Sequence, residues 1–142
     1  MSFYKEPVIY IGYDSREKAA FEVCCESIRS TASQPVTIIP LRQEALRRAG
    51  LYSRSHYTAP LRPNQKIDVF DNKPYSTEFS FTRFLIPALN QYEGMALFMD
   101  SDMLVRSDIW EILDYANETD EPIHCVHHNY TPDVGKKMDG QK

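Results

Sequence analysis

The sequence predicts an α/β protein built on a mostly parallel sheet. Short apolar runs typical of buried strands alternate with amphipathic stretches in the first fifty residues. A further apolar run at 95–99 ends at two aspartates separated by one residue. With 142 residues, of which 42% are hydrophobic and 25% charged, the chain is expected to form one domain with a substantial core.

The first predicted strand is 8–11, and a turn is expected at 12–15. Asp14 and Glu17 have the spacing of a capping box with the aspartate at the N-cap, so a helix should run from there towards Thr31. Residues at helical spacing predict its buried face. These residues are Ala20, Val23, Cys24, Ile28 and Thr31.

The next two elements repeat the pattern of a strand followed by a helix. Residues 36–41 predict a strand between two prolines, and residues 42–49 predict a helix. Gly50 lies just past the end of that helix, and two arginines occupy its last turn. This order favours parallel strands joined by right-handed crossovers.

Residues 51–75 interrupt the pattern, because they carry three prolines and no sustained periodicity. A loop of this length is uncommon in a compact domain and suggests a lid or binding loop. A solvated insertion is the alternative, and 65–70 could contain a strand.

Three further elements are predicted before residue 127. Residues 77–90 predict a helix kinked at Pro87, and 95–99 predict a strand apolar on both faces. Ser107 is the expected N-cap of a helix that reaches Tyr115, and 123–126 predict a last strand. The apolar face of the 77–90 helix is expected to comprise Phe81, Phe84, Leu85 and Leu89.

Composition excludes several classes of protein. The net charge is −4 and there is no basic cluster, which argues against a nucleic-acid partner. No apolar run approaches the length of a transmembrane segment, and the N-terminus lacks a signal-peptide pattern. Three cysteines without a regular spacing do not indicate a disulfide framework. A cytoplasmic protein is expected.

Asp100 and Asp102 are the strongest candidates for a ligand site. In open α/β sheets, ligands bind at the carboxyl ends of strands, which is where these residues are expected to lie. Side chains two apart in an extended segment point the same way, so both carboxylates could approach one hard cation. With 10 Asp in the chain, the tripeptide occurs by chance roughly 0.7 times, so its position carries the argument.

Two stretches carry a more specific pattern. They are Phe81-x-Arg83-Phe84-x-Ile86-Pro87 and Met95-x-Leu97-x-Met99-Asp100-x-Asp102-Met103-Leu104-Val105. The pattern is similar to the nucleotide-sugar-binding part of family 8 glycosyltransferases, and the resemblance extends from the first strand to about Tyr115. It implies a GT-A fold, which is a Rossmann-like, mostly parallel sheet with a DxD motif at a strand end.

The resemblance also implies a donor site. Asp100 and Asp102 would bind Mn²⁺, or Mg²⁺, bridging the diphosphate of a nucleotide-sugar, with Ser101 between them; a UDP-sugar is the expected donor. Tyr13, Asp14 and Arg16 match the loop that holds the nucleoside, and Arg83 matches an arginine that contacts the sugar side. The acceptor would be a carbohydrate or another hydroxyl compound.

Each assignment has an alternative. Asp14 could serve only as a helix cap and Tyr13 as a packed surface aromatic. Arg83 could be an exposed residue that pairs with Glu78 or Asn90. His127 or His128 could contribute to a metal site at the same edge of the sheet.

Alternative functions also fit an apolar strand followed by two aspartates. Haloacid-dehalogenase-like phosphatases use such a pair with magnesium, although their motif usually lies on the first strand. A non-catalytic nucleotide-sugar-binding or interaction module is the third hypothesis.

Members of the family that this chain resembles continue well past the length of this chain. The expectation is therefore a single GT-A-like domain over residues 1–142, incomplete at its C-terminal part. Such a donor half would bind a nucleotide-sugar but transfer the sugar poorly, and it offers no general base or nucleophile to name.

Overall fold

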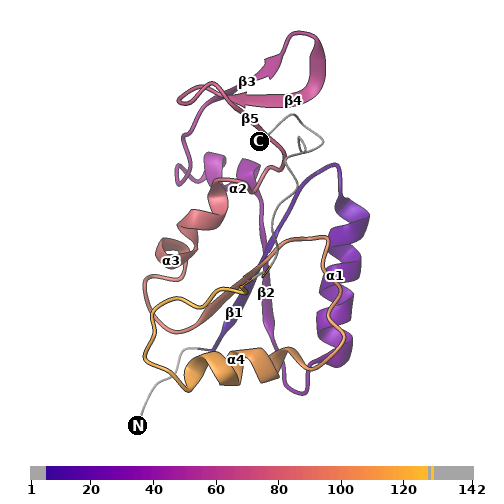
Figure 1. Cartoon of the computed structure of the whole chain (residues 1–142), viewed down its shortest axis with the longest axis vertical. Coiled ribbons are helices and arrows are strands. Elements are labelled where there is room, and N and C mark those ends of the chain that lie inside the picture. The colour runs from indigo at the N-terminus through magenta and orange to yellow at the C-terminus, as the bar shows by residue number, and fades with distance from the viewer. Residues whose placement is uncertain (1–5, 128, 130–142) are drawn as a thin grey trace.

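A computed structural model of the protein describes residues 6–127 and 129 and has a mixed α/β architecture (Figure 1). A three-stranded parallel sheet has the order β2-β1-β6, formed by Thr37–Leu41, Val8–Gly12 and Ala96–Met99. Three further strands form a separate antiparallel sheet. The predicted α/β class and the parallel pairing of the first strand with its neighbours are therefore confirmed.

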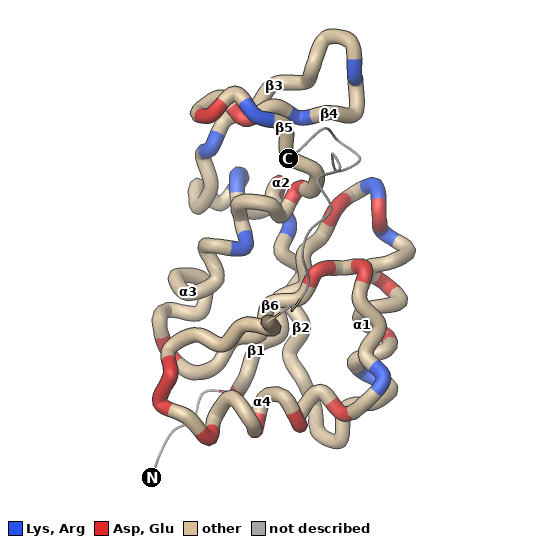
Figure 2. Tube along the Cα trace, in the orientation of Figure 1, with Lys and Arg blue, Asp and Glu red and all other residues tan. Residues whose placement is uncertain are grey.

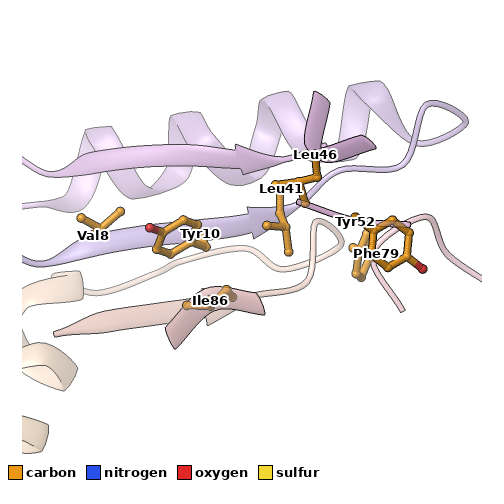
Figure 3. Packing of buried hydrophobic residues seen from close by; sticks show 7 residues of the cluster. All are labelled: Val8, Tyr10, Leu41, Leu46, Tyr52, Phe79 and Ile86. Carbon is orange, nitrogen blue, oxygen red and sulfur yellow. The ribbon is translucent and has the colours of Figure 1, made fainter. Parts of the chain in front are cut away.

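β1 is the central strand of the parallel sheet, and all five of its residues are buried. Val8 and Tyr10 point into one core cluster, whereas Ile9 and Ile11 point into another, because successive side chains alternate between the faces of a strand. Figure 3 shows the first cluster, in which Phe79 lies at the end of β1. Helices cover both faces, as parallel sheets require.

The expected position of the 95–99 strand was wrong in one respect. β6 lies at the edge of the described sheet, and three of its four residues are only half-buried. Pairing with β1 alone explains the partial exposure. The apolar composition of the run identifies a strand, but the position of a strand within a sheet depends on its neighbours.

α1 (Lys18–Thr31) covers the face of the sheet that contains Ile9 and Ile11. The predicted capping box is wrong, because Glu17 is the N-cap residue and makes no side-chain cap hydrogen bond. The buried face is centred on Cys24 and Ile28 as expected, but Val23 is 56% exposed.

β2 and α2 agree with the sequence prediction to within one residue at each end. α2 spans Gln43–Arg48, and Gly50 follows with a φ of +72°, a conformation that glycine adopts without strain. Pro40 lies inside β2, where it is tolerated because β2 is an edge strand of the described sheet.

The prediction of a long loop at 51–75 was wrong. The segment forms the antiparallel sheet from β3 (His56–Ala59), β4 (Arg62–Asp68) and β5 (Pro74–Tyr75). An ion pair fixes its base, because Arg54, whose side chain is partly exposed, donates two hydrogen bonds of 2.6 and 2.8 Å to the buried carboxylate of Asp68. The strand considered at 65–70 overlaps the second half of β4.

The predicted helix at 77–90 is also corrected. A 3₁₀ helix, η1 (Thr82–Leu85), leads into the short α3 (Ile86–Leu89), and Pro87 lies in the first turn of α3 rather than at a kink. Phe84 is 77% exposed and does not belong to the buried face.

α4 (Ile109–Asn117) lies at the end of the molecule opposite the antiparallel sheet (Figure 1). Its N-cap is Asp108 rather than Ser107, and the Asp108 carboxylate accepts hydrogen bonds from the backbone N–H groups of Trp110 and Ser33. The predicted strand at 123–126 is absent, and those residues are exposed. None of the helices in residues 6–127 is both long and apolar enough to span a membrane.

Candidate functional site

The candidate site lies at the carboxyl edge of the parallel sheet. The strand register places Gly12 opposite Leu41 and Ile11 opposite Met99. The residues that follow these strands therefore emerge side by side: Arg42 from β2, Tyr13 from β1 and Asp100 from β6. The sequence assigned two of these three to the site and did not identify Arg42.

Asp100 and Asp102 follow β6, but the backbone between them is not extended. Ser101 and Asp102 lie in a turn, so the expected alignment of two side chains along a strand does not apply. Asp102 is exposed, whereas the Oδ1 atom of Asp100 is buried and has no hydrogen-bond partner among the described residues. The side chain of Ser101 is buried, and its hydroxyl likewise lacks a partner in the described chain.

Arg83 contacts Asp100, as a shared site would require. Its Nη1 atom lies 3.6 Å from Asp100 Oδ1, and its guanidinium carbon lies 5.0 Å from the ring centre of Phe98. Nε also donates to the carbonyl oxygen of Phe79 at 3.4 Å. The ion pair of Arg83 is thus with Asp100, rather than with Glu78 as the alternative interpretation supposed.

Asp14 is fully buried and accepts four hydrogen bonds. Three come from Arg16, through its backbone N–H at 3.0 Å, Nε at 2.9 Å and Nη2 at 2.7 Å, and one from the backbone N–H of Glu78 at 3.1 Å. Burial alone would raise the pKa of Asp14, but the hydrogen bonds from Arg16 and Glu78 lower it below its ordinary value. Asp14 is therefore an ionised anchor for residues 76–78, since Arg16 also donates to the carbonyl oxygen of Ser76.

Tyr13 is covered on one face. The Arg42 guanidinium carbon lies 3.9 Å from the centre of the Tyr13 ring, which is cation–π geometry. Phe21 contacts the same ring edge-on, with centroids 5.1 Å apart. The ring face that meets Arg42 is therefore closed to a stacked base.

Sequence reasoning missed a polar group that joins the two sheets. Glu78 accepts a hydrogen bond from Ser15 Oγ at 2.9 Å and forms an ion pair with Lys66 of β4 at 3.1 Å. Gln43 Nε2 donates to the carbonyl oxygen of Glu78 at 3.0 Å. These contacts join residues 12 to 63 positions apart in the chain, so no local sequence signal could have identified them.

The charge distribution favours an anionic ligand at this end of the molecule. Residues 42–83 contain eight Lys and Arg against four Asp and Glu, although the whole chain carries a charge of −4. Figure 2 shows these basic positions around α2 and the antiparallel sheet, whereas α4 at the opposite end is acidic. Clustered cations raise the local concentration of anions.

The residues present fit a hard divalent cation in their chemistry. Carboxylate oxygens are the ligands that Mg²⁺ and Mn²⁺ prefer, and the buried Oδ1 of Asp100 has a free acceptor. Within residues 6–127 and 129, no three His, Cys, Asp or Glu side chains gather as a metal site, so a ligand and water would supply the other oxygens. His127 is exposed, and His128 lies outside the described residues.

Two buried cysteines, Cys24 and Cys25, lie on α1. Burial, followed by the neighbouring Cys25 thiol and the Asp102 carboxylate, raises the pKa of Cys24 to about 11. A thiol with this pKa is protonated at neutral pH and is a poor nucleophile or metal ligand.

An open groove of about 510 Å³ lies between α1 and the edge strand β2. It is lined by Phe21, Glu22, Cys25, Glu26, Arg29, Ile38 and Pro40. None of the predicted site residues lines it, so the groove is separate from the carboxyl-edge site. The convergent charged groups described above, rather than the groove, define the candidate site.

Comparison with known proteins finds a similar protein in a plant. Protein CDI from Arabidopsis thaliana is 42% identical over 132 residues, which cover 93% of this chain and 45% of that protein. The chain thus spans less than half the length of this curated relative. No family model matches the sequence, and no solved structure matches it.

Proposed function

We propose that this chain is the donor-binding part of a metal-dependent glycosyltransferase, which binds a nucleotide-sugar at the carboxyl edge of a GT-A-type sheet. The observation that carries the proposal is the contact between Arg83 and Asp100 at the end of β6, beside β1, which Tyr13 and Asp14 follow. These residues come from three separate parts of the sequence, and the resemblance to family 8 glycosyltransferases assigned all of them to one donor site.

The chemistry of sugar transfer explains why such a group of residues is useful. Breaking the bond between a sugar and a diphosphate leaves negative charge on the diphosphate. A divalent cation held by Asp100 and Asp102 would supply Lewis-acid stabilisation of that charge. Arg83 lies 3.6 Å from Asp100 and offers a forked donor suited to phosphate oxygens.

The anchored loop after β1 has a supporting role in this proposal. Because Asp14 is saturated by Arg16 and the N–H of Glu78, it holds the loop in place rather than presenting a free oxygen to a ribose. The ligand contacts expected from this loop would then come from Tyr13 and from the exposed part of Arg16, whose side chain is 46% accessible.

Metal-dependent binding tests the proposal. We expect UDP and UDP-sugars to raise the unfolding temperature of the chain with Mn²⁺ present and to have little effect without it. A ligand at a hundred times its dissociation constant stabilises the folded state by about 2.7 kcal/mol, which is readily measured. Asp102→Asn should remove the manganese dependence and leave the unliganded unfolding temperature unchanged, because Asp102 is exposed.

A matched control is Asp114→Asn on α4, where an exposed aspartate lies at the opposite end of the molecule. It should bind like the parent chain. Hydrolysis of an aryl phosphate without a nucleotide would favour the phosphatase alternative. Metal-dependent binding without sugar transfer or donor hydrolysis would favour a non-catalytic module, and manganese-dependent binding that survives Asp102→Asn would contradict the site.

A further inference from the structure

Arg42 is the residue at the carboxyl edge that the proposed donor site has not yet used. It follows β2 directly, and the strand register sets it beside Tyr13. Its side chain is exposed, and its guanidinium carbon lies over the Tyr13 ring, 3.9 Å from the ring centre. The stack holds a planar cation at a defined place on the edge of the sheet, which restricts its freedom before any ligand arrives.

Arg42 differs from the other arginines near the site in its partners. Arg16, Arg54 and Arg83 each form an ion pair with an aspartate. In the part of the chain that the structure describes, no carboxylate lies within 4 Å of the Arg42 guanidinium, which makes a stacking contact only. Within the described residues, its five N–H donors are therefore available to a ligand.

The order of residues along the edge indicates which part of a ligand would meet Arg42. Asp100 follows β6 and Arg42 follows β2, with Tyr13 of the central strand between them. The two outer strands lie about 10 Å apart, which is twice the spacing of neighbouring strands. A nucleotide whose diphosphate lies at Asp100 and Arg83 would extend its nucleoside across Tyr13 towards Arg42.

We propose, on the basis of the donor-binding function above, that Arg42 recognises the base of the nucleotide and selects bases with a carbonyl oxygen at C4 of a pyrimidine or C6 of a purine. A guanidinium can only donate hydrogen bonds, so it pairs with carbonyl and ring-nitrogen acceptors and opposes an amino group. Uracil carries a carbonyl where cytosine carries an amino group, and guanine differs from adenine in the same way. Tyr13 serves as the platform that orients Arg42, rather than as the surface on which the base stacks.

Calorimetric titration with UDP, CDP, GDP and ADP in the presence of Mn²⁺ tests this assignment. The parent chain should bind UDP more tightly than CDP, and GDP more tightly than ADP, by about tenfold or more in each pair, as expected for a charge-assisted hydrogen bond. Arg42→Ala should reduce both ratios to near one. Arg42→Lys keeps the charge but loses the planar fork, so it should retain only part of the preference.

The control variant is Arg48→Ala, which removes an exposed arginine from the last turn of α2 and should leave both ratios unchanged. Equal weakening of all four nucleotides by Arg42→Ala would overturn base recognition and indicate a phosphate contact. Manganese-dependent binding with the same ratios in the parent and in Arg42→Ala would overturn the Arg42 assignment alone. If none of the four nucleotides shows manganese-dependent binding, the donor site and this inference are overturned together.

Discussion

Replacing Gly12 by alanine tests how the core is packed at the base of the candidate site. Gly12 is the last residue of β1, immediately before Tyr13. A Cβ atom at this position would lie 2.6 Å from both Cγ and Cδ2 of Phe79. Carbon atoms in contact prefer separations of about 3.5–4.0 Å, so the ring would have to retreat by roughly 1 Å.

Phe79 has little room for that movement. It is 2% exposed and belongs to the core cluster that also contains Tyr10, Leu41 and Ile86 (Figure 3). The close atoms include Cγ, which is tied to the backbone through Cβ, so rotating the end of the side chain cannot relieve the contact. Overpacking of this kind destabilises proteins by about 1–3 kcal/mol.

We expect Gly12→Ala to lower the free energy of unfolding by that amount, measured by urea denaturation followed by circular dichroism. For a chain of this size, each kcal/mol corresponds to roughly 3–5 °C in the unfolding temperature. Phe79→Leu removes the clashing ring atoms, so Gly12→Ala should be less harmful by about 1 kcal/mol or more in that background.

Gly50→Ala provides the comparison for this double-mutant cycle. Gly50 has a φ of +72° and no atom within 4 Å of the added Cβ, so alanine there is unfavourable through backbone strain alone. Phe79→Leu should not rescue it. If Gly12→Ala leaves the stability unchanged, or if its effect is the same with and without Phe79→Leu, the argument from steric overlap is refuted.

Three further predictions concern capping, pH and the aromatic platform. Asp108→Ala should lower the free energy of unfolding by about 0.5–2 kcal/mol in urea denaturation, because it removes the N-cap of α4. Ser107→Ala should have almost no effect, and the reverse order would show that the cap is misassigned. The folded-state pKa of Asp14 lies below its ordinary value of 3.8. Its contribution to the free energy of unfolding is therefore fully present above that pH and is lost as the pH falls through the folded-state pKa. The unfolding free energy should therefore fall below about pH 4, and Asp14→Asn should flatten that part of the profile; an unchanged profile would contradict the ion pair between Arg16 and the buried Asp14 carboxylate. Tyr13→Ala removes the support of Arg42 and should reduce the UDP-to-CDP preference in calorimetry, whereas a preference equal to that of the parent would show that Arg42 needs no platform.

The sequence by itself determined the first half of the parallel sheet. The apolar runs of β1 and β2, the amphipathic stretch of α1 and the glycine after α2 are local signals, because each depends on residues within a few positions of one another. The strand that ends at Asp100 could also be predicted, since a short apolar run followed by polar residues identifies its end.

Only the tertiary structure decided how the site is assembled. Asp14 has the spacing of a helix cap, yet its carboxylate is engaged by Arg16 and by the N–H of Glu78, which is 64 positions away. The antiparallel sheet arises in a proline-rich segment because its strands satisfy one another's backbone groups and its base is fixed by the ion pair between Arg54 and the buried Asp68. The position of Arg42 over Tyr13 follows from the pairing of β1 with β2. Local periodicity shows which side chains face inward, whereas contacts between distant segments depend on strand pairing, which no short stretch of sequence encodes.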